Sequence, residues 1–285
     1  MAELADALDS GSSRGNSVEV QVLLAANMKK LLWFVLLAAK TYAISVSPET
    51  AEQIGAKIWI NECGGALVGL THWGENENFP SLGIGHFIWY PAGKQDRFVE
   101  GFPPLVAYLK TQKAKIPVWI QTECPQCPQC PWSNRKEFYA DFHSPRMKEL
   151  RQFLYETRHL QALFIAHRLE KALPQMIESL SPKEREKITV TFNQLAKDPQ
   201  GLYALIDYVN FKGEGTSLTE QYKGQGWGLL QVLQLMPATS KNIIDDFIAS
   251  AKTVLTRRVQ NSPPERDEAR WLKGWTNRLE TYKTP

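Results

Sequence analysis

Residues 59–90 read WINECGGALVGLTHWGENENFPSLGIGHFIWY, and the sequence pattern changes twice along them. A helical run that begins at the cap residue Ser47, with proline in its first turn, ends near Glu62, because Gly64 and a second glycine follow. Two β-like runs then flank the turn-forming segment 74–78. This order predicts a helix that leads directly into a β-hairpin.

The rest of the chain has helical periodicity. Apolar residues recur at intervals of three and four, as in the stripe that includes Leu150, Leu154 and Phe164. The sequence therefore predicts an α+β fold that is mostly helical, with a small hairpin lobe packed on a helical body. The expected helices span residues 101–113, 134–142, 145–180, 182–197, 199–211, 226–235, 237–260 and 264–283.

The amino-acid composition is typical of a globular protein. The chain has 285 residues, of which 43% are hydrophobic and 22% charged, so it is long and apolar enough to bury a core. Its net charge is only +3, which gives no electrostatic reason to expect a nucleic-acid partner. Nine Trp, nine Tyr and twelve Phe would allow stacking on sugar rings.

An export signal is predicted near the N-terminus. Residues 28–43 begin with Met and two lysines, continue with the apolar stretch Leu31–Ala39 and end with small residues, as in a secretory signal peptide. A buried core helix is the alternative to a signal peptide. A permanent membrane span is not expected, because the apolar stretch is too short for one. Residues 1–27 then form an upstream extension and 44–285 a single domain. We expect a periplasmic or secreted bacterial protein.

Glu62 is the candidate catalytic acid. It ends a helix, where unpaired carbonyl groups create a negative potential, and its neighbours Trp59 and Ile60 are apolar. Both effects favour a carboxyl group that keeps its proton near neutral pH. The hairpin supplies further carboxylates at Glu75 and Glu77, and two facing carboxyl groups are the arrangement that glycoside hydrolysis uses.

The segment Ser81-Leu82-Gly83-Ile84-Gly85-His86 resembles the T-I-G-I-G-H segment of phage-type lysozymes. The resemblance implies a lysozyme-like fold and cleavage of peptidoglycan glycan strands without a cofactor. It also implies that Glu62 is the acid and that Glu75 takes the place of the second acid. Ser81 takes the place of the family's threonine and could hold the attacking water.

A second resemblance lies downstream. Glu214 precedes Gly228-Leu229-Leu230-Gln231, an order similar to slt-type lytic transglycosylases, in which one Glu precedes a G-L-M-Q segment. A transglycosylase that uses Glu62 or Glu214 is therefore an alternative to a hydrolase. A non-catalytic wall-binding or scaffolding protein with the same fold is a third hypothesis.

Several other side chains are candidates for contact with the sugar. We expect residues 211–231 to form the opposite wall of one cleft beside the hairpin. The candidate substrate-binding residues are Trp73, Glu77, His86, Gln231, Tyr222 and Trp227. Trp271 and Trp275, four residues apart, are expected to be packing anchors instead.

The Pro/Cys-rich loop 123–131 contains Cys124, Cys127 and Cys130. Three thiols are one short of a closed zinc site, and outside the cytoplasm a disulfide is the more plausible use of them. We therefore expect no metal ion.

Overall fold

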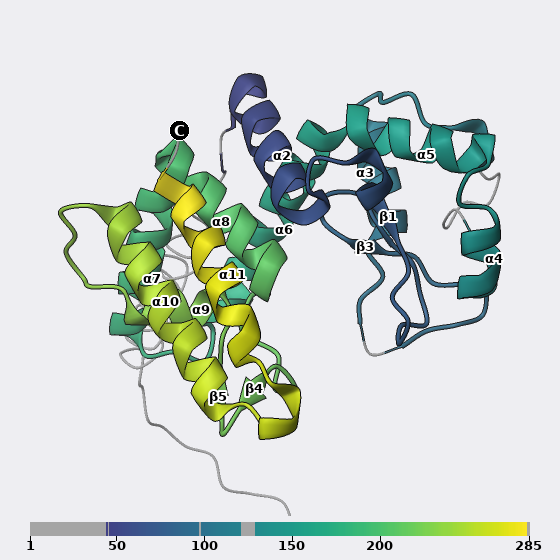
Figure 1. Ribbon diagram of the computed structural model, residues 1–285. Helices are drawn as coiled ribbons and strands as arrows, with labels where there is room; N and C mark the ends of the chain where they lie inside the picture. Colours follow the sequence, from purple (N-terminus) through teal and green to yellow (C-terminus); the bar gives the residue numbers. More distant parts are fainter. Residues whose placement is uncertain (1–43, 45, 97, 121–128, 284–285) are drawn as a thin grey trace, which may run out of the picture. The chain divides into compact units, whose positions relative to one another are not determined.

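Helices dominate the computed structural model, and the small strands form short antiparallel sheets (Figure 1). The predicted α+β, mostly helical class is therefore confirmed. The predicted extension and signal peptide, and most of the Pro/Cys-rich loop, lie outside the described residues, and Ile44–Pro285 form one compact unit. The structure describes residues 44, 46–96, 98–120 and 129–283.

The elements follow one another with short connections. The α-helices are α2 (Pro48–Cys63), α3 (Phe102–Thr111), α4 (Arg135–Ala140), α5 (Pro145–Glu156), α6 (Arg158–Ile177), α7 (Pro182–Lys197), α8 (Pro199–Lys212), α9 (Leu229–Leu235), α10 (Ile243–Asn261) and α11 (Ala269–Glu280). The strands are β1 (Thr71–His72), β2 (Ser81–Leu82), β3 (Phe87–Ile88), β4 (Gln221–Tyr222) and β5 (Gln225–Gly226). Short 3₁₀ turns are η1 (Leu67–Leu70), η2 (Val118–Ile120), η3 (Pro264–Arg266) and η4 (Thr281–Lys283).

Side-chain caps explain where most helices begin. Ser47, Ser144 and Ser181 each accept a hydrogen bond from a backbone N–H in the first turn of the helix that follows, and each is followed by proline. Asp198 does the same for α8. At the other end of α2, Gly64 adopts left-handed backbone (φ 59°), which glycine allows without steric cost.

The prediction of one long helix over residues 145–180 is wrong. Residues 145–180 form two helices, α5 and α6, which are separated at Thr157 (φ −96°, ψ 10°). Periodicity did not reveal the break, because the apolar stripe continues through it. The expected helix 237–260 begins later, at Ile243, where the Asn242 side chain caps it.

The region predicted as a hairpin forms a three-stranded antiparallel sheet in the order β1-β2-β3. Within this sheet Ser81 pairs with His72 and Ile88. The turn between β2 and β3 is anchored to α6 by Gln161. Its Oε1 accepts from the backbone N–H of Ile84 (3.0 Å), and its Nε2 donates to the carbonyl of Leu154 (2.6 Å). This anchoring fixes the turn beside the end of α2, which also packs against α6.

Helix α8 is the central helix of the larger group of helices. Its residues from Gly201 to Tyr208 are all buried, as expected for a helix that is covered on every side. It packs against α6, α7, α9 and α10, and α10 in turn packs along α11 (Figure 1). Near the hairpin a separate aromatic core joins Trp73, Trp89, Trp132 and Phe138. Among the described residues, no helix combines the length and hydrophobicity that crossing a membrane requires.

Gly83 provides a test of the anchored turn. Its φ is +70°, and a Cβ there would lie 2.3 Å from Oε1 of Gln161, whereas Gly93 has φ +73° and open space around it. Both Gly→Ala variants adopt left-handed backbone at a cost of about 1–2 kcal/mol. We expect Gly83→Ala to lower the free energy of unfolding by about 2 kcal/mol more than Gly93→Ala, measured by urea denaturation. Equal losses would show that Gln161 does not hold the turn.

Candidate functional site

Glu62 lies in the last turn of α2, and its side chain is 12% exposed. Its Oε1 accepts hydrogen bonds from Nη2 of Arg278 (2.5 Å) and Nδ2 of Asn210 (3.0 Å). Its Oε2 lies 3.8 Å from Nε2 of His86, whose side chain is 47% exposed. The site therefore combines residues of α2, α8, α11 and the β2–β3 turn.

Arg278 is shared between two carboxylates. Its Nε donates to Oδ2 of Asp207 (2.8 Å) and its Nη2 to Oδ1 of Asp207 (2.8 Å), in addition to Glu62. Tyr282 and Asn61 also donate to Asp207, which is completely buried. Although burial alone would lower the pKa of Arg278, Asp207 and Glu62 raise it well above its usual range. Arg278 is thus a permanent cation at this site.

The environment of Glu62 corrects one expectation. The helix end and the apolar neighbours predict a carboxyl group without a cationic partner, but the structure adds a guanidinium and an amide that both donate hydrogen bonds to it. In the described arrangement Glu62 is one half of an ion pair. The missing signal is tertiary, because Arg278 lies 216 residues away in sequence.

Asn210 connects Glu62 to the hairpin turn. Its Nδ2 donates to Oε1 of Glu62 and also lies 3.3 Å from the carbonyl oxygen of Ile84. In the same turn, His86 adopts left-handed backbone (φ 46°), an uncommon conformation for a non-glycine residue that often accompanies function. The S-L-G-I-G-H segment and Glu62 therefore form one hydrogen-bonded unit.

The predicted partners of Glu62 on the hairpin are not joined to it. Among the hydrogen bonds and ion pairs of the described residues, none links Glu62 to Glu75, Glu77 or Ser81. Glu75 and Glu77 are exposed in the β1–β2 connection, where Oε2 of Glu77 accepts from the backbone N–H of Gly74 (3.1 Å). Ser81 is half-buried within β2.

Two candidates, one aromatic and one amide, have structural roles instead of facing a ligand. Trp73 is buried against Phe138, and its Nε1 donates to the carbonyl of Glu77 (2.8 Å). Gln231 accepts from Gly228 N–H and donates to the carbonyl of Gly215, so its amide holds the loop before α9. The prediction that Trp73 and Gln231 contact sugar is therefore wrong for this conformation.

Tyr222 and Trp227 pack on each other, with ring centroids 4.7 Å apart. The Tyr222 hydroxyl donates to Oε1 of Glu268 (2.8 Å), and the guanidinium of Arg258 lies 4.0 Å from the ring centroid of Trp227. Trp227 is buried, and Arg258 forms an ion pair with Glu268. These contacts stabilise the β4–β5 region, and they correct the expectation that Tyr222 and Trp227 touch sugar.

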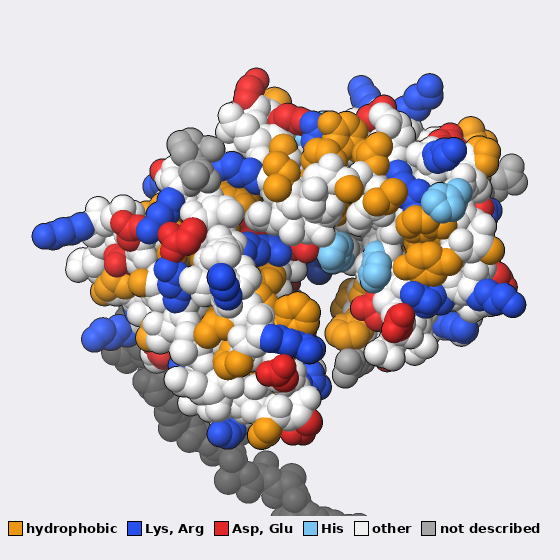
Figure 2. Space-filling model, viewed as in Figure 1, with side chains coloured by type: hydrophobic (Ala, Val, Ile, Leu, Met, Phe, Trp, Pro, Cys, Tyr) orange, Lys and Arg blue, Asp and Glu red, His pale blue; other side chains and the backbone are white. Residues whose placement is uncertain are grey.

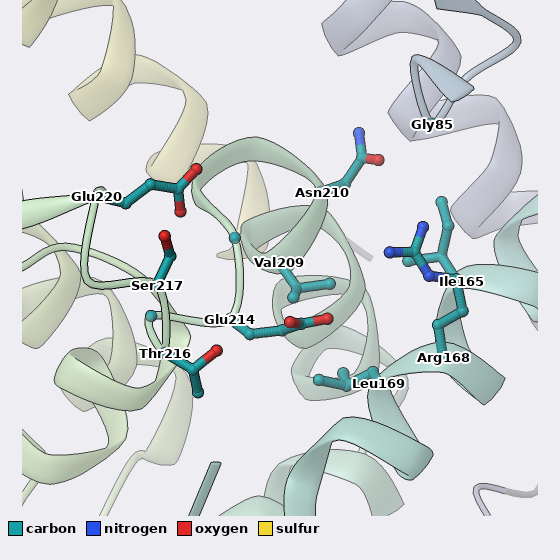
Figure 3. A pocket seen from close by; sticks show the side chains of 12 residues that line it. Gly85, Ile165, Arg168, Leu169, Val209, Asn210, Glu214, Thr216, Ser217 and Glu220 are labelled. Carbon is teal, nitrogen blue, oxygen red and sulfur yellow. The ribbon is translucent and has the colours of Figure 1, made fainter. Parts of the chain in front are cut away.

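A cavity of about 270 Å³ lies on the other side of Asn210. It is bounded by the β2–β3 turn, α6, the end of α8 and the loop that follows α8 (Figure 3). Its polar lining comes from Arg168, Asn210, Glu214, Ser217 and Glu220. In Figure 3 the Glu214 side chain extends toward α6, which carries Arg168. Residues from 213 to 220 thus line a cavity together with the β2–β3 turn, whereas Glu62 is not among its lining residues. The expected wall formed by residues 211–231 stays a prediction.

Three residues of the site, Asp207, Arg278 and Arg168, belong to no sequence motif. Asp207 could have been suspected, because a single acid within an otherwise apolar helical run has to find a partner when buried. Nothing in the pattern around Arg278 or Arg168 distinguishes them from arginines on a solvated face.

Cysteines and metal-binding groups add little at this site. Cys63, next to Glu62, and Cys130 are buried free thiols, and burial raises the pKa of each to about 12. Cys124 and Cys127 lie outside the described residues. Within the described part of the chain, no cluster of three or more His, Cys, Asp or Glu side chains could hold a metal ion.

Compared with known proteins, the chain matches no family model, and no curated protein or solved structure matches it. The assignment of a function therefore depends on the site itself.

Lys212, at the end of α8, allows a test of the electrostatics. Its Nζ lies 3.6 Å from the ring centroid of Trp275 and 3.9 Å from that of Phe211. Burial, followed by the charges of Arg258 and Arg278, lowers the pKa of Lys212 to about 6. Between this value and the ordinary value of 10.5, the unfolded chain binds a proton that the folded chain lacks, so stability rises with pH.

We expect Lys212→Met to raise the melting temperature at pH 7 and to flatten the dependence of stability on pH between about 6 and 10. Lys171→Met, at an exposed position on α6, is the matched control and should change neither. Thermal unfolding measured at several pH values tests both expectations, the melting temperature at pH 7 and the dependence of stability on pH. An unchanged slope in Lys212→Met would mean that the two rings keep the ammonium group charged.

Proposed function

We propose that this protein is an exported glycoside hydrolase with a lysozyme-like fold, which cleaves the glycan strands of peptidoglycan with the Glu62 carboxyl group at the reaction centre. The observation on which this proposal depends is the hydrogen-bonded unit formed by Glu62, Asn210 and the β2–β3 turn. It supports the proposal because Asn210 links the Glu62 carboxyl group to the turn that carries His86 and also lines the cavity that Glu214 lines. Export through the segment 28–43 is part of the proposal.

The two oxygens of Glu62 differ, and the difference suits the role of an acid. Oε1 accepts from Arg278 and Asn210, whereas within the described ranges the contact given for Oε2 is the exposed His86 at 3.8 Å. In the proposed mechanism a bound sugar excludes water from Oε2, and this desolvation favours protonation of that oxygen. The proton then passes to the glycosidic oxygen as the bond breaks.

Arg278 holds the carboxyl group in position during this step. Its contacts with Asp207 persist when Glu62 is neutral, so the guanidinium remains paired and the side chain does not move. As the proton leaves Oε2 for the glycosidic oxygen, the carboxylate becomes charged and its hydrogen bond from Arg278 to Oε1 becomes charge-assisted on both sides, which favours the transfer. Glu75 and Ser81, on the hairpin, are the proposed stabiliser of the cationic centre and holder of the attacking water.

The test is activity of Glu62→Gln on purified sacculi, followed by loss of turbidity and by mass spectrometry of the products. We expect at least about a hundredfold loss of activity, because the amide cannot donate an acidic proton. The melting temperature should stay close to wild type, because the amide oxygen still accepts from Asn210. Glu186→Gln, on the exposed surface of α7, is the control and should retain full activity. Wild-type activity in Glu62→Gln contradicts the assignment.

A lytic transglycosylase is a second candidate, favoured by the position of Glu214 in the cavity wall. Product mass separates the two, because hydrolysis adds a water to the products and transglycosylation does not. Loss of activity in Glu214→Gln together with retained activity in Glu62→Gln supports this candidate. Binding to sacculi without any turnover would instead support a non-catalytic wall-binding protein, for which the Glu62–Arg278 ion pair is a structural element only.

A further inference from the structure

The oxygen of Glu62 that does not bind Arg278 lies next to a histidine. Oε1 accepts hydrogen bonds from Arg278 and Asn210. Oε2 lies 3.8 Å from Nε2 of His86. An acid in the proposed mechanism needs a proton on Oε2. Histidine is the side chain whose charge ordinarily changes between pH 5 and 8, so this neighbour has the chemistry of a proton donor.

The backbone on both sides of His86 is fixed. The side chain of Gln161 holds the N–H of Ile84, and the N–H of His86 donates to the carbonyl of Gly83 (3.3 Å). Ile84 and Phe87 are both buried. The left-handed backbone of His86 (φ 46°) therefore lies within a turn that is anchored before and after it. Such a turn keeps the side chain of His86 directed to one place.

The His86 side chain also reaches solvent. It is 47% exposed, whereas the Glu62 side chain is 12% exposed. Figure 2 shows histidine side chains (pale blue) at the surface beside a hollow in the face that is in view. A ring that is exposed on one side and faces a carboxyl group on the other can exchange protons with both water and that carboxyl group.

The charges around the turn make Glu62 the closest partner of His86. The titratable and charged groups on the surrounding elements are His72 of β1, Glu62 of α2, Arg168 of α6, Lys212 and Glu214 at the end of α8 and after it, and Arg278 of α11. Within the described part of the chain, the ion pair of His86 is with Glu62. Gln161 and Asn210, which hold the turn, carry no charge.

We infer that His86 supplies the proton that Glu62 gives to the glycosidic oxygen, a role that rests on the proposed function for its reaction. The protonated imidazole releases its proton from Nε2 to Oε2 of Glu62, and the neutral ring then takes a proton from water. The balance of hydrolysis is unchanged, because the attacking water loses one proton as the leaving oxygen gains one. His86 acts through Glu62 and is therefore a positioning residue.

The distance between the two side chains fits a transfer that substrate completes. At 3.8 Å the two atoms are farther apart than in a direct hydrogen bond, and a small rotation of the exposed ring, or one bridging water, closes the path. A bound sugar excludes water from this pair and so disfavours both charges. Transfer of the proton from the imidazole to the carboxylate removes the two charges together.

The main experiment measures kcat and KM of His86→Asn on purified glycan strands across pH. Asparagine tolerates left-handed backbone but does not carry a titratable proton. We expect kcat to fall about tenfold at pH 7 with KM nearly unchanged. The loss should shrink toward pH 5, where water protonates Glu62 directly. His167→Asn is the matched control, because His167 is 51% exposed and pairs with Glu170 instead of Glu62. It should follow the wild type at every pH.

His86→Gly provides a second, independent test. Glycine adopts the left-handed backbone without steric cost, and its missing side chain leaves space beside Glu62. We expect free imidazole in the assay to restore several-fold activity to His86→Gly and to leave the wild type unchanged. The melting temperatures of both variants show whether each is folded at the assay temperature.

A third measurement does not depend on activity. We expect the NMR signals of the His86 ring to titrate about half a pH unit lower in Glu62→Gln than in the wild type, because a neighbouring negative charge favours the protonated ring. The ring signals of His167 should titrate alike in both proteins. An unchanged midpoint for His86 would show that the two side chains are not coupled, which overturns the relay.

The outcomes separate the relay from the activity. Equal kcat in wild type and His86→Asn at every pH overturns the relay and leaves the proposed hydrolase standing. A loss that is the same at all pH values, without rescue of His86→Gly by imidazole, also overturns it and makes His86 a structural residue of the turn. Absence of cleavage by the wild type overturns the hydrolase and the relay together.

Discussion

Arg278 joins three helices that are far apart in the sequence. Its guanidinium contacts Asp207 on α8 and Glu62 on α2 from its own position on α11, and Tyr282 and Asn61 complete the hydrogen bonding of Asp207. Removing Arg278 would leave the buried Asp207 carboxylate without its cation, which costs about 3–5 kcal/mol. The position of the candidate carboxyl group thus depends on α11, although the motif that predicts it lies entirely within residues 59–90. Any function of Glu62 has to be compatible with this arginine.

The ion pair with Arg278 changes the chemistry that Glu62 can perform, but Glu62 remains a candidate catalytic residue. A carboxylate that is fixed at one oxygen keeps a defined direction for the other, and Oε2 is the oxygen turned to the exposed His86. A free carboxylate at a helix end would be easier to protonate but would rotate among several positions. Catalytic groups gain from fixed geometry, which here comes from Asn210 and Arg278. A general acid also needs a proton on Oε2. In the proposed mechanism this protonation depends on the exclusion of water by the substrate.

The sequence predicts local features well and tertiary partners poorly. Ser47, Ser181 and Gly64 mark helix boundaries because the capping groups lie within a few residues of the backbone they serve. The turn between β1 and β2 follows from glycines and turn residues in the same way, whereas the division of the second predicted run into β2 and β3 was not predicted. In contrast, the break at Thr157 lies within a continuous apolar stripe, and the pairing of Glu62 with Arg278 joins positions that no short motif relates. Periodicity identifies which face of a helix is apolar, but it does not identify what covers that face.

The tryptophans illustrate this limit most clearly. Trp73 and Trp227 lie in polar, glycine-rich surroundings that are typical of a binding loop, yet both rings are buried. Trp271 lies in a helix with regular spacing to Trp275, as a core residue would, yet more than half of it is exposed. In each case the neighbours in space decide, namely Phe138 over Trp73 and Arg258 over Trp227. The sequence around an indole therefore does not indicate whether its ring is buried or exposed.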